Sequence, residues 1–114
     1  MLLVDDEPLV RATVAEGLRG AGYQVMEAAT PAAALARVKD GPLPDIVVTD
    51  QMMPGMTGAS LAAALRAMQP AMPVLVITGY VAPGAADLAG LPVLAKPFRL
   101  DELAAAIDAL LPSG

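Results

Sequence analysis

The sequence predicts an α/β domain in which five parallel strands form one sheet and helices cover both of its faces. Short apolar runs alternate with segments of helical periodicity along most of the chain. Strands that are joined by helices pair in parallel through right-handed crossovers. The apolar runs are continuous rather than alternating, as burial on both faces of a sheet requires. We therefore expect a doubly wound sheet in a single domain that spans residues 1–114.

Nine elements are expected, and they alternate along the chain. The predicted strands are residues 2–4, 23–27, 45–49, 74–77 and 92–95, and the predicted helices are residues 7–20, 30–40, 58–68 and 101–111. Helices are predicted where apolar residues recur every three or four positions, and strands where they run continuously over a few residues. The turn residues between the runs then set the boundaries.

In the first half of the chain, each boundary has its own signal. Gly20 ends the first helix, since glycine readily follows the last helical turn. Gln24 and Glu27 make the second strand more polar than the others, which is typical of an edge strand. Thr30 and Pro31 offer an N-cap and a favourable first helical residue for the second helix.

In the second half, proline and glycine mark the boundaries. Residues 41–44 read Gly-Pro-Leu-Pro and separate the second helix from the third strand, and Pro70 and Pro73 end the third helix. Residues 81–90 contain two glycines and a proline, so we expect a loop with one short turn in place of a full crossover helix. The closing helix is expected to begin near residues 100–101.

The composition excludes several classes of function. The chain has no cysteine and no histidine, which rules out disulfides, Cys- or His-ligated metal sites and a Ser-His-Asp triad. A net charge of −5 and 3% aromatic residues argue against direct nucleic-acid binding. No apolar run approaches the roughly 20 residues that span a bilayer. We therefore expect an acidic cytoplasmic domain with no membrane or nucleic-acid partner.

Polar residues follow four of the five predicted strands. They are Asp5 and Asp6, Asp50, Thr78 and Gly79, and Lys96. Parallel strands end at the same edge of a sheet, so these residues are expected to meet. The second strand has no such residues after it, which fits an edge strand in the order 2-1-3-4-5. In that order the ligand crevice opens between the first and third strands.

These residue types suit phosphoryl transfer. Mg²⁺, with Mn²⁺ as an alternative ion, prefers oxygen ligands and would relieve the repulsion among clustered carboxylates. Asp50 can attack phosphorus through a carboxylate oxygen. Lys96 can neutralise phosphoryl oxygens, and the Thr78 hydroxyl and Gly79 N–H can donate hydrogen bonds to them. The backbone carbonyl near Met52 is a further candidate metal ligand.

Each signal alone also has a purely structural explanation. Asp5 and Asp6 could serve only to begin a helix, where acidic residues are favoured by the helix dipole. Asp50 before a Pro/Gly-rich loop could mark an ordinary strand exit, and Lys96 could be a surface lysine before a turn. Their joint occurrence at four strand ends is what favours a functional site.

Four motifs in this chain occur in the order and near the spacing of a known family. They are Leu3-Val4-Asp5-Asp6-Glu7-Pro8, residues 49–58, Val76-Ile77-Thr78-Gly79-Tyr80 and Ala95-Lys96-Pro97-Phe98. Over essentially its whole length the sequence resembles the receiver domain of bacterial two-component response regulators, either a single-domain regulator or part of a hybrid histidine kinase. The resemblance implies a flavodoxin-like fold and a phosphorylation-dependent switch rather than an enzyme, with at most self-catalysed phosphotransfer and autodephosphorylation.

The resemblance also implies roles for individual residues. Asp50 would be the phospho-acceptor, with the phosphoryl group coming from the phosphohistidine of a histidine kinase or histidine phosphotransfer protein. Asp6, the Asp50 carboxylate and the Met52 carbonyl would hold Mg²⁺, with Asp5 acting mainly through water. Thr78 and Lys96 would contact the phosphoryl group, as further members of the same site.

Two departures from the family pattern affect signal transmission. Val93 stands where receivers usually carry the aromatic residue that moves on activation, and the 81–90 segment is short and rich in proline and glycine. We therefore expect Tyr80 or residues 81–90 to take over the conformational response.

Three other functions are disfavoured by particular residues. An aspartate-nucleophile phosphohydrolase commonly has a second aspartate two residues after the first, where this chain has Met52. A flavodoxin-like cofactor binder needs a phosphate-cradling loop after the first strand, where Asp5, Asp6 and Glu7 would repel phosphate. A receiver that is never phosphorylated is disfavoured because every residue type that the reaction needs is present.

Overall fold

The computed structural model describes residues 1–79 and 91–111, and within them the elements follow the predicted order. The strands are β1 (Leu2–Val4), β2 (Met26–Ala28), β3 (Val47–Asp50), β4 (Val74–Thr78) and β5 (Val93–Ala95). The helices are α1 (Pro8–Gly20), α2 (Pro31–Asp40), α3 (Gly58–Met68) and α4 (Leu100–Leu110).

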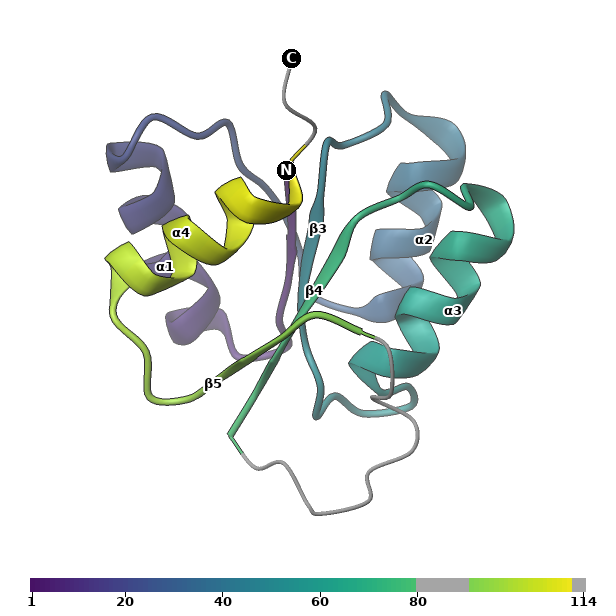
Figure 1. The fold of residues 1–114 in the computed structure, drawn as a ribbon. Helices are drawn as coiled ribbons and strands as arrows, with labels where there is room; N and C mark the ends of the chain where they lie inside the picture. The colour runs from purple at the N-terminus through teal and green to yellow at the C-terminus, as the bar shows by residue number, and fades with distance from the viewer. Residues whose placement is uncertain (80–90, 112–114) are drawn as a thin grey trace.

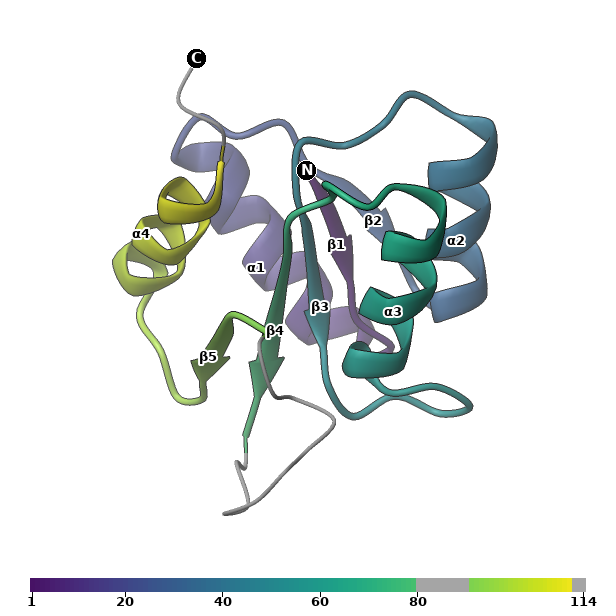
Figure 2. The ribbon, with the colours of Figure 1, turned by 45° about the vertical axis from the view of Figure 1, so that its right-hand side comes forward.

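The strands form one parallel sheet in the order β2-β1-β3-β4-β5, which confirms the predicted fold class and strand order (Figures 1 and 2). Val4 at the end of β1 is in register with Thr49 in β3. Thr78 at the end of β4 is in register with Ala95 at the end of β5. The carboxyl ends of these four strands therefore share one edge of the sheet.

The helices cover the two faces of the sheet in pairs. Helices α1 and α4 pack on one face, and α2 and α3 pack on the other (Figures 1 and 2). Each face has its own core of buried side chains. Leu2 and Val4 face the α2–α3 layer, whereas Leu3 between them faces the α1–α4 layer. All three are almost fully buried, and full burial of such a side chain contributes about 1.5–3 kcal/mol.

The caps of the helices agree with the local sequence. The Thr30 hydroxyl accepts a hydrogen bond from the Ala33 N–H at 3.0 Å, which confirms Thr30 as the N-cap of α2. Helix α4 begins at Leu100, as expected, and its first turn is closed by the Glu102 carboxylate, which accepts the Arg99 N–H at 2.8 Å.

Among the strands, the bounds of β2 and β3 differ most from the prediction, and β4 and β5 differ by one residue each. Strand β2 starts at Met26 rather than at residue 23, because the Tyr23 N–H donates to the Leu18 carbonyl and completes the turn that ends α1. Gly22 in that turn has a φ of 103°, where glycine is favoured. Strand β3 starts two residues later and ends one residue later than predicted, so Asp50 is its last residue rather than the first residue of the loop.

The remaining predictions concern membrane spans, residues 80–90 and Val93. In the part of the chain that the structure describes, no helix has both the length and the apolar character needed to cross a membrane. The short turn expected within residues 81–90 and the switching role expected for Tyr80 lie outside the described residues. Val93, the first residue of β5, is partly buried against the α2–α3 core.

Candidate functional site

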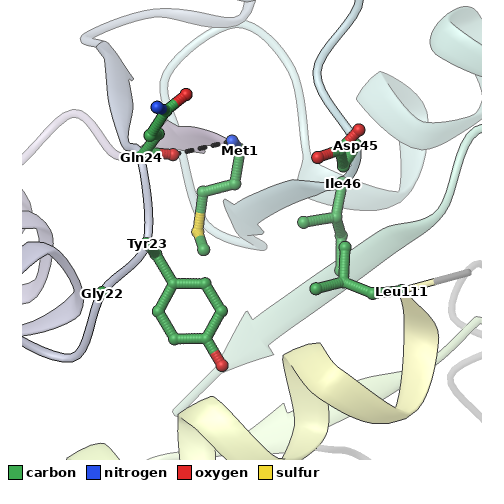
Figure 3. A pocket seen from close by; sticks show the side chains of 7 residues that line it. All are labelled: Met1, Gly22, Tyr23, Gln24, Asp45, Ile46 and Leu111. Atoms are coloured by element: carbon green, nitrogen blue, oxygen red, sulfur yellow. Dashed lines mark hydrogen bonds between the residues drawn. The ribbon is translucent and has the colours of Figure 1, made fainter. Parts of the chain in front are cut away.

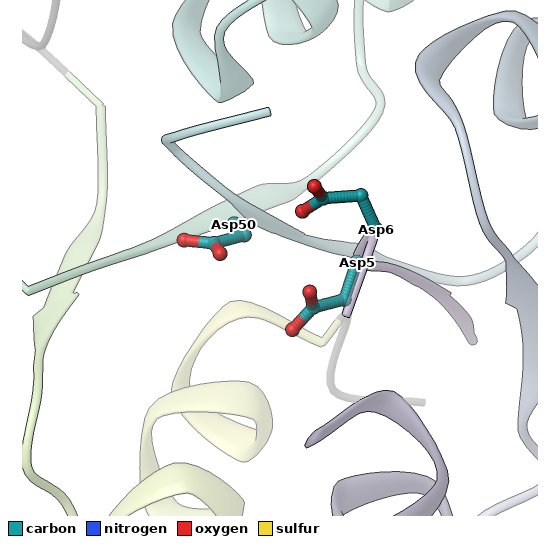
Figure 4. Close-up of side chains that lie close together, drawn as sticks. All are labelled: Asp5, Asp6 and Asp50. Atoms are coloured by element: carbon teal, nitrogen blue, oxygen red, sulfur yellow. The ribbon is translucent and has the colours of Figure 1, made fainter. Parts of the chain in front are cut away.

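Three aspartates converge where β1 and β3 end. Asp5 and Asp6 follow β1 directly, and Asp50 closes the neighbouring β3. Each side chain offers a carboxylate oxygen, and these three oxygens all lie within 4.8 Å of one another (Figure 4). Adjacent parallel strands thus bring together residues that are 44 positions apart in the sequence.

The cluster is poorly solvated. Asp5 is 7% exposed and Asp50 9% exposed, whereas Asp6 is half-buried. Burial raises the pKa of the Asp5 carboxyl above its ordinary value of 3.8, and the charges of Asp50 and Asp6 add to that rise. The Glu7 N–H, which donates to Asp5 Oδ1 at 2.9 Å, and the Lys96 ammonium act in the opposite direction. The site therefore carries more negative charge than its own donors offset.

The donor set fits Mg²⁺. The ion takes hard oxygen ligands, carboxylates among them, and usually keeps several of its own waters. The three carboxylates of the cluster each offer such an oxygen, and these oxygens lie within 4.8 Å of one another. Because the cluster has only carboxylates, it favours a hard cation over softer transition metals.

Lys96 supplies a positive charge to the same edge. Its ammonium lies 3.5 Å from Asp50 Oδ2, and its side chain is 37% exposed. The Lys96 N–H donates to the Thr78 carbonyl at 2.8 Å, so the ends of β5 and β4 are bonded directly. The bond between Lys96 and Pro97 is cis. Lys96 thus reaches Asp50 from the strand two places away in the sheet.

Thr78 and Gly79 lie beside Lys96. Thr78 ends β4 and is 1% exposed, while Gly79 follows it at the surface. A Cβ placed on Gly79 would lie 3.9 Å from Lys96 Cδ, which is ordinary van der Waals contact. The structure therefore places both residues at the carboxyl edge of the sheet, next to the lysine.

The loop after Asp50 is narrow at its base and exposed at its tip. Met52 is 72% exposed, and Gly55 has a φ of 82°, which only glycine adopts readily. At the base, a Cβ on Gly58 would lie 2.6 Å from the Asp50 carbonyl oxygen, too close for any other residue without a shift of the backbone. Gly58 therefore allows α3 to begin directly against the end of β3.

Two residues that hold this site were not singled out from the sequence. Arg11 of α1 donates to the main-chain carbonyl of Asp5 at 2.8 Å and pairs with Glu27 of β2 at 3.2 Å. Gln51 is buried and bonds to both β4 and α3. Arg11 is six residues from Asp5 and Gln51 eight from Ala59, and no local motif marks either bond. Only the position of Gln51 directly after Asp50 could have drawn attention to it.

The family model described as the response regulator receiver domain matches residues 1–108 of this chain. The chain belongs to the receiver domain family of two-component response regulators. A receiver domain is a phosphorylation-dependent switch, and the acidic cluster of this one lies at the carboxyl edge of its sheet.

Several relatives of this receiver domain are known. The transcriptional regulatory protein PrrA of Mycobacterium tuberculosis is 40% identical over 97% of the chain, which corresponds to 49% of that protein. The chain thus spans about half the length of that relative. Sporulation initiation phosphotransferase F of Bacillus subtilis is 31% identical over 98% of the chain and 93% of that protein.

Solved structures show the same fold. Chemotaxis protein CheY4 of Vibrio cholerae is 32% identical, covers 96% of both chains and has a TM-score of 0.85. The response regulator TrrA of Thermotoga maritima, solved in complex with Mg²⁺-BeF, is 29% identical, covers 96% of both chains and has a TM-score of 0.87.

A cavity of about 350 Å³ lies at the opposite, amino-terminal edge of the receiver domain (Figure 3). It is lined by Met1, Gly22, Tyr23, Gln24, Asp45, Ile46 and Leu111. The Tyr23 hydroxyl beside it donates to the Asp108 carboxylate of α4, which raises the pKa of Tyr23. A single carboxylate lines this cavity, so among the described residues the acidic cluster is the better candidate for phosphoryl chemistry.

Proposed function

We propose that Asp50 accepts a phosphoryl group from a phosphohistidine, and that the added charge switches the binding of a protein partner. One observation carries this proposal: three carboxylates and the Lys96 ammonium converge at one edge of the sheet, with the ammonium 3.5 Å from Asp50. The proposal treats residues 1–114 as one receiver domain. It includes self-catalysed phosphotransfer and autodephosphorylation, and no turnover of another substrate.

The proposed step is the transfer of a phosphoryl group from nitrogen to oxygen. An Asp50 carboxylate oxygen forms a bond to phosphorus while the bond between phosphorus and the donor imidazole nitrogen breaks, and the imidazole takes up a proton as it leaves. Lys96 neutralises charge on the transferred phosphoryl oxygens. The Thr78 hydroxyl and the Gly79 N–H donate hydrogen bonds to those oxygens.

Asp6, the Asp50 carboxylate and the Met52 carbonyl are the proposed protein ligands of Mg²⁺, for which Mn²⁺ can substitute. Asp5 is proposed to act mainly through a bound water. When bound, the ion would offset the repulsion between the carboxylates and the incoming phosphoryl group. The fit of the donor set and the 4.8 Å separation of the carboxylate oxygens support this assignment.

The proposed donor is a histidine kinase or a histidine phosphotransfer protein. Sensor kinase CckA of Brucella abortus is 36% identical over 97% of this chain, which supports a place for this receiver domain in such a relay. Leu9 and Val10 in the first turn of α1 are 83% and 42% exposed, only a few residues beyond Asp6. They give a protein donor an apolar surface near the site. A donor kinase that uses ATP would place the reaction in the cytoplasm.

The test is acid-labile phosphate incorporation with acetyl phosphate and Mg²⁺. The wild type is expected to take up close to one phosphoryl group per chain, and Asp50→Asn is expected to take up less than about 1% of that amount, because an amide is a poor nucleophile. Asp45→Asn, which changes an exposed aspartate at the opposite edge, is the matched control and is expected to label normally.

Labelling that persists in Asp50→Asn would remove Asp50 from the proposed role. Release of many phosphates per chain without accumulation of label would favour the phosphohydrolase alternative. Transfer from a phosphohistidine protein that is no faster than transfer from acetyl phosphate would argue against a protein donor.

A further inference from the structure

Gln51 joins the end of β3 to two other segments of the fold. Its backbone N–H donates to the Ile77 carbonyl of β4 at 2.8 Å, and its carbonyl accepts the Gly58 N–H at 2.9 Å. Its side-chain oxygen Oε1 accepts the Ala59 N–H at 2.9 Å. One residue therefore bonds to the neighbouring strand and twice to the first turn of α3.

Gln51 is buried, so the loss of any of these hydrogen bonds would be costly. The residue is 6% exposed, so bulk water offers little replacement for a lost partner. A Cβ on Gly58 would lie 3.1 Å from Gln51 Cα, which shows how closely the two backbones approach. Residues 51 and 58 thus form a closed neck, and the loop of residues 52–57 that leaves it exposes Met52, Pro54 and Gly55 but buries Met53 in the α2–α3 core.

The neck lies between two proposed ligands of one ion. Asp50 precedes Gln51 and Met52 follows it, so Gln51 links the two residues that supply the carboxylate and the carbonyl of the proposed metal site. Any rotation of the Gln51 backbone would turn the Met52 carbonyl relative to the Asp50 carboxylate. The Gln51 carboxamide opposes that rotation because Ala59, its partner, is fixed in α3.

We propose that Gln51 is the positioning residue of the loop of residues 52–57. Its buried carboxamide fixes the Met52 carbonyl relative to the Asp50 carboxylate and thereby sets the affinity for Mg²⁺. The inference rests on the proposed function, since it takes Asp50 and the Met52 carbonyl as ligands. Residues that orient metal ligands from behind commonly change metal affinity by about 10- to 100-fold when they are replaced.

The test compares two Gln51 variants with a change at the same helix terminus. Gln51→Met keeps the length of the side chain but lacks the oxygen acceptor, and Gln51→Asn is one methylene too short to reach Ala59. Thr57→Val is the matched control, because Thr57 Oγ1 accepts the Ser60 N–H at 3.1 Å and so also caps the first turn of α3. Mg²⁺ binding is measured by calorimetry on the unphosphorylated chain, and folding by circular dichroism.

Both Gln51 variants are expected to bind Mg²⁺ about tenfold more weakly or worse, and Thr57→Val within twofold of the wild type. The Mg²⁺ concentration that gives half-maximal phosphorylation by acetyl phosphate should rise by the same factor in the Gln51 variants. The rate at saturating Mg²⁺ should stay within about threefold of the wild type. A purely structural role for Gln51 would not weaken the Mg²⁺ affinity while leaving the rate at saturating Mg²⁺ unchanged.

A dissociation constant within twofold of the wild type in either folded Gln51 variant would overturn the inference, as would an equal loss in Thr57→Val. A second measurement uses the wild type alone: Mg²⁺ should slow amide hydrogen exchange at Gly58 and Ala59, and unchanged exchange there would also overturn it. Failure of the proposed function is distinguishable, because a chain that binds Mg²⁺ but is never labelled on Asp50 leaves these affinity differences intact.

Discussion

The Asp5 carboxyl is buried beside two other carboxylates, and burial is the main cause of its raised pKa. A carboxyl whose pKa is higher in the folded protein than in the unfolded chain binds protons more tightly when folded. Its favourable contribution to folding is complete below the unfolded pKa, near 3.8, and is lost as the pH rises through the folded pKa. Ionisation of Asp5 therefore opposes folding in the metal-free protein.

Asp5→Asn is accordingly expected to raise the stability of the metal-free protein at pH 7. The asparagine keeps an oxygen that can accept the Glu7 N–H, and it removes a poorly solvated charge. The gain, measured by urea unfolding in EDTA, should shrink as the pH falls toward 3.8 because the wild-type carboxyl becomes protonated.

The same variant should bind Mg²⁺ severalfold more weakly. The substitution is therefore expected to raise the stability of the metal-free protein and to lower its affinity for the ion. Asp45→Asn, at an exposed position, should change neither property. A lower urea midpoint for Asp5→Asn than for the wild type, at pH 7 in EDTA, would show that the buried Asp5 charge does not oppose folding.

At the scale of single elements, the start of α3 is the most constrained junction of the site. Helix α3 begins at Gly58 with its backbone against the Asp50 carbonyl, and the Thr57 hydroxyl caps its first turn. The close approach of Gly58 lets the helix follow β3 after a short loop, and the same approach leaves no room for a side chain.

Gly58→Ala is expected to destabilise the protein by about 1–3 kcal/mol, since the added methyl group would lie 2.6 Å from the Asp50 carbonyl oxygen. Gly20→Ala at the end of α1 is the control, because a Cβ there meets nothing within 4 Å. It should be neutral or stabilising by up to about 1 kcal/mol. Urea unfolding measures both, and equal effects of the two substitutions would show that the backbone at residue 58 relaxes freely.

The elements also show which boundaries the sequence could reveal. Thr30 and Pro31 lie next to the helix that they begin, so the start of α2 was predictable from local signals. The start of β2 was not, because the Tyr23 N–H bonds back to Leu18 rather than into the sheet. Gln51 escaped prediction for a related reason: Ala59 becomes its partner only when α3 folds back against β3.

At the scale of the whole molecule, the sheet order explains why the meeting of these polar residues at one edge was predictable. The order β2-β1-β3-β4-β5 places the ends of four strands at one edge, so polar residues after separate apolar runs had to lie near one another. The hydrogen bonds and ion pairs that set their geometry, such as the 3.5 Å approach of Lys96 to Asp50, depend on side-chain packing, which the order alone does not determine.

The concentration of negative charge in a chain of net charge −5 predicts that Mg²⁺ stabilises the folded protein. At about 100 times its dissociation constant, the ion should raise the free energy of unfolding by about 2.7 kcal/mol, because it binds the folded state alone. Thermal unfolding with and without Mg²⁺ measures the effect, and Asp6→Asn should abolish most of it. An equal rise with NaCl of the same ionic strength would reduce the effect to general screening.

The separation of the core into two layers has a consequence for how this fold can diversify. Leu2 and Val4 pack in one layer and Leu3 in the other, so substitutions beneath α2 and α3 contact a different set of core side chains from those beneath α1 and α4. Each flank can therefore accumulate its own changes during descent and adapt to a different neighbour. The edge that carries the acidic cluster is built from strand ends that belong to neither flank alone.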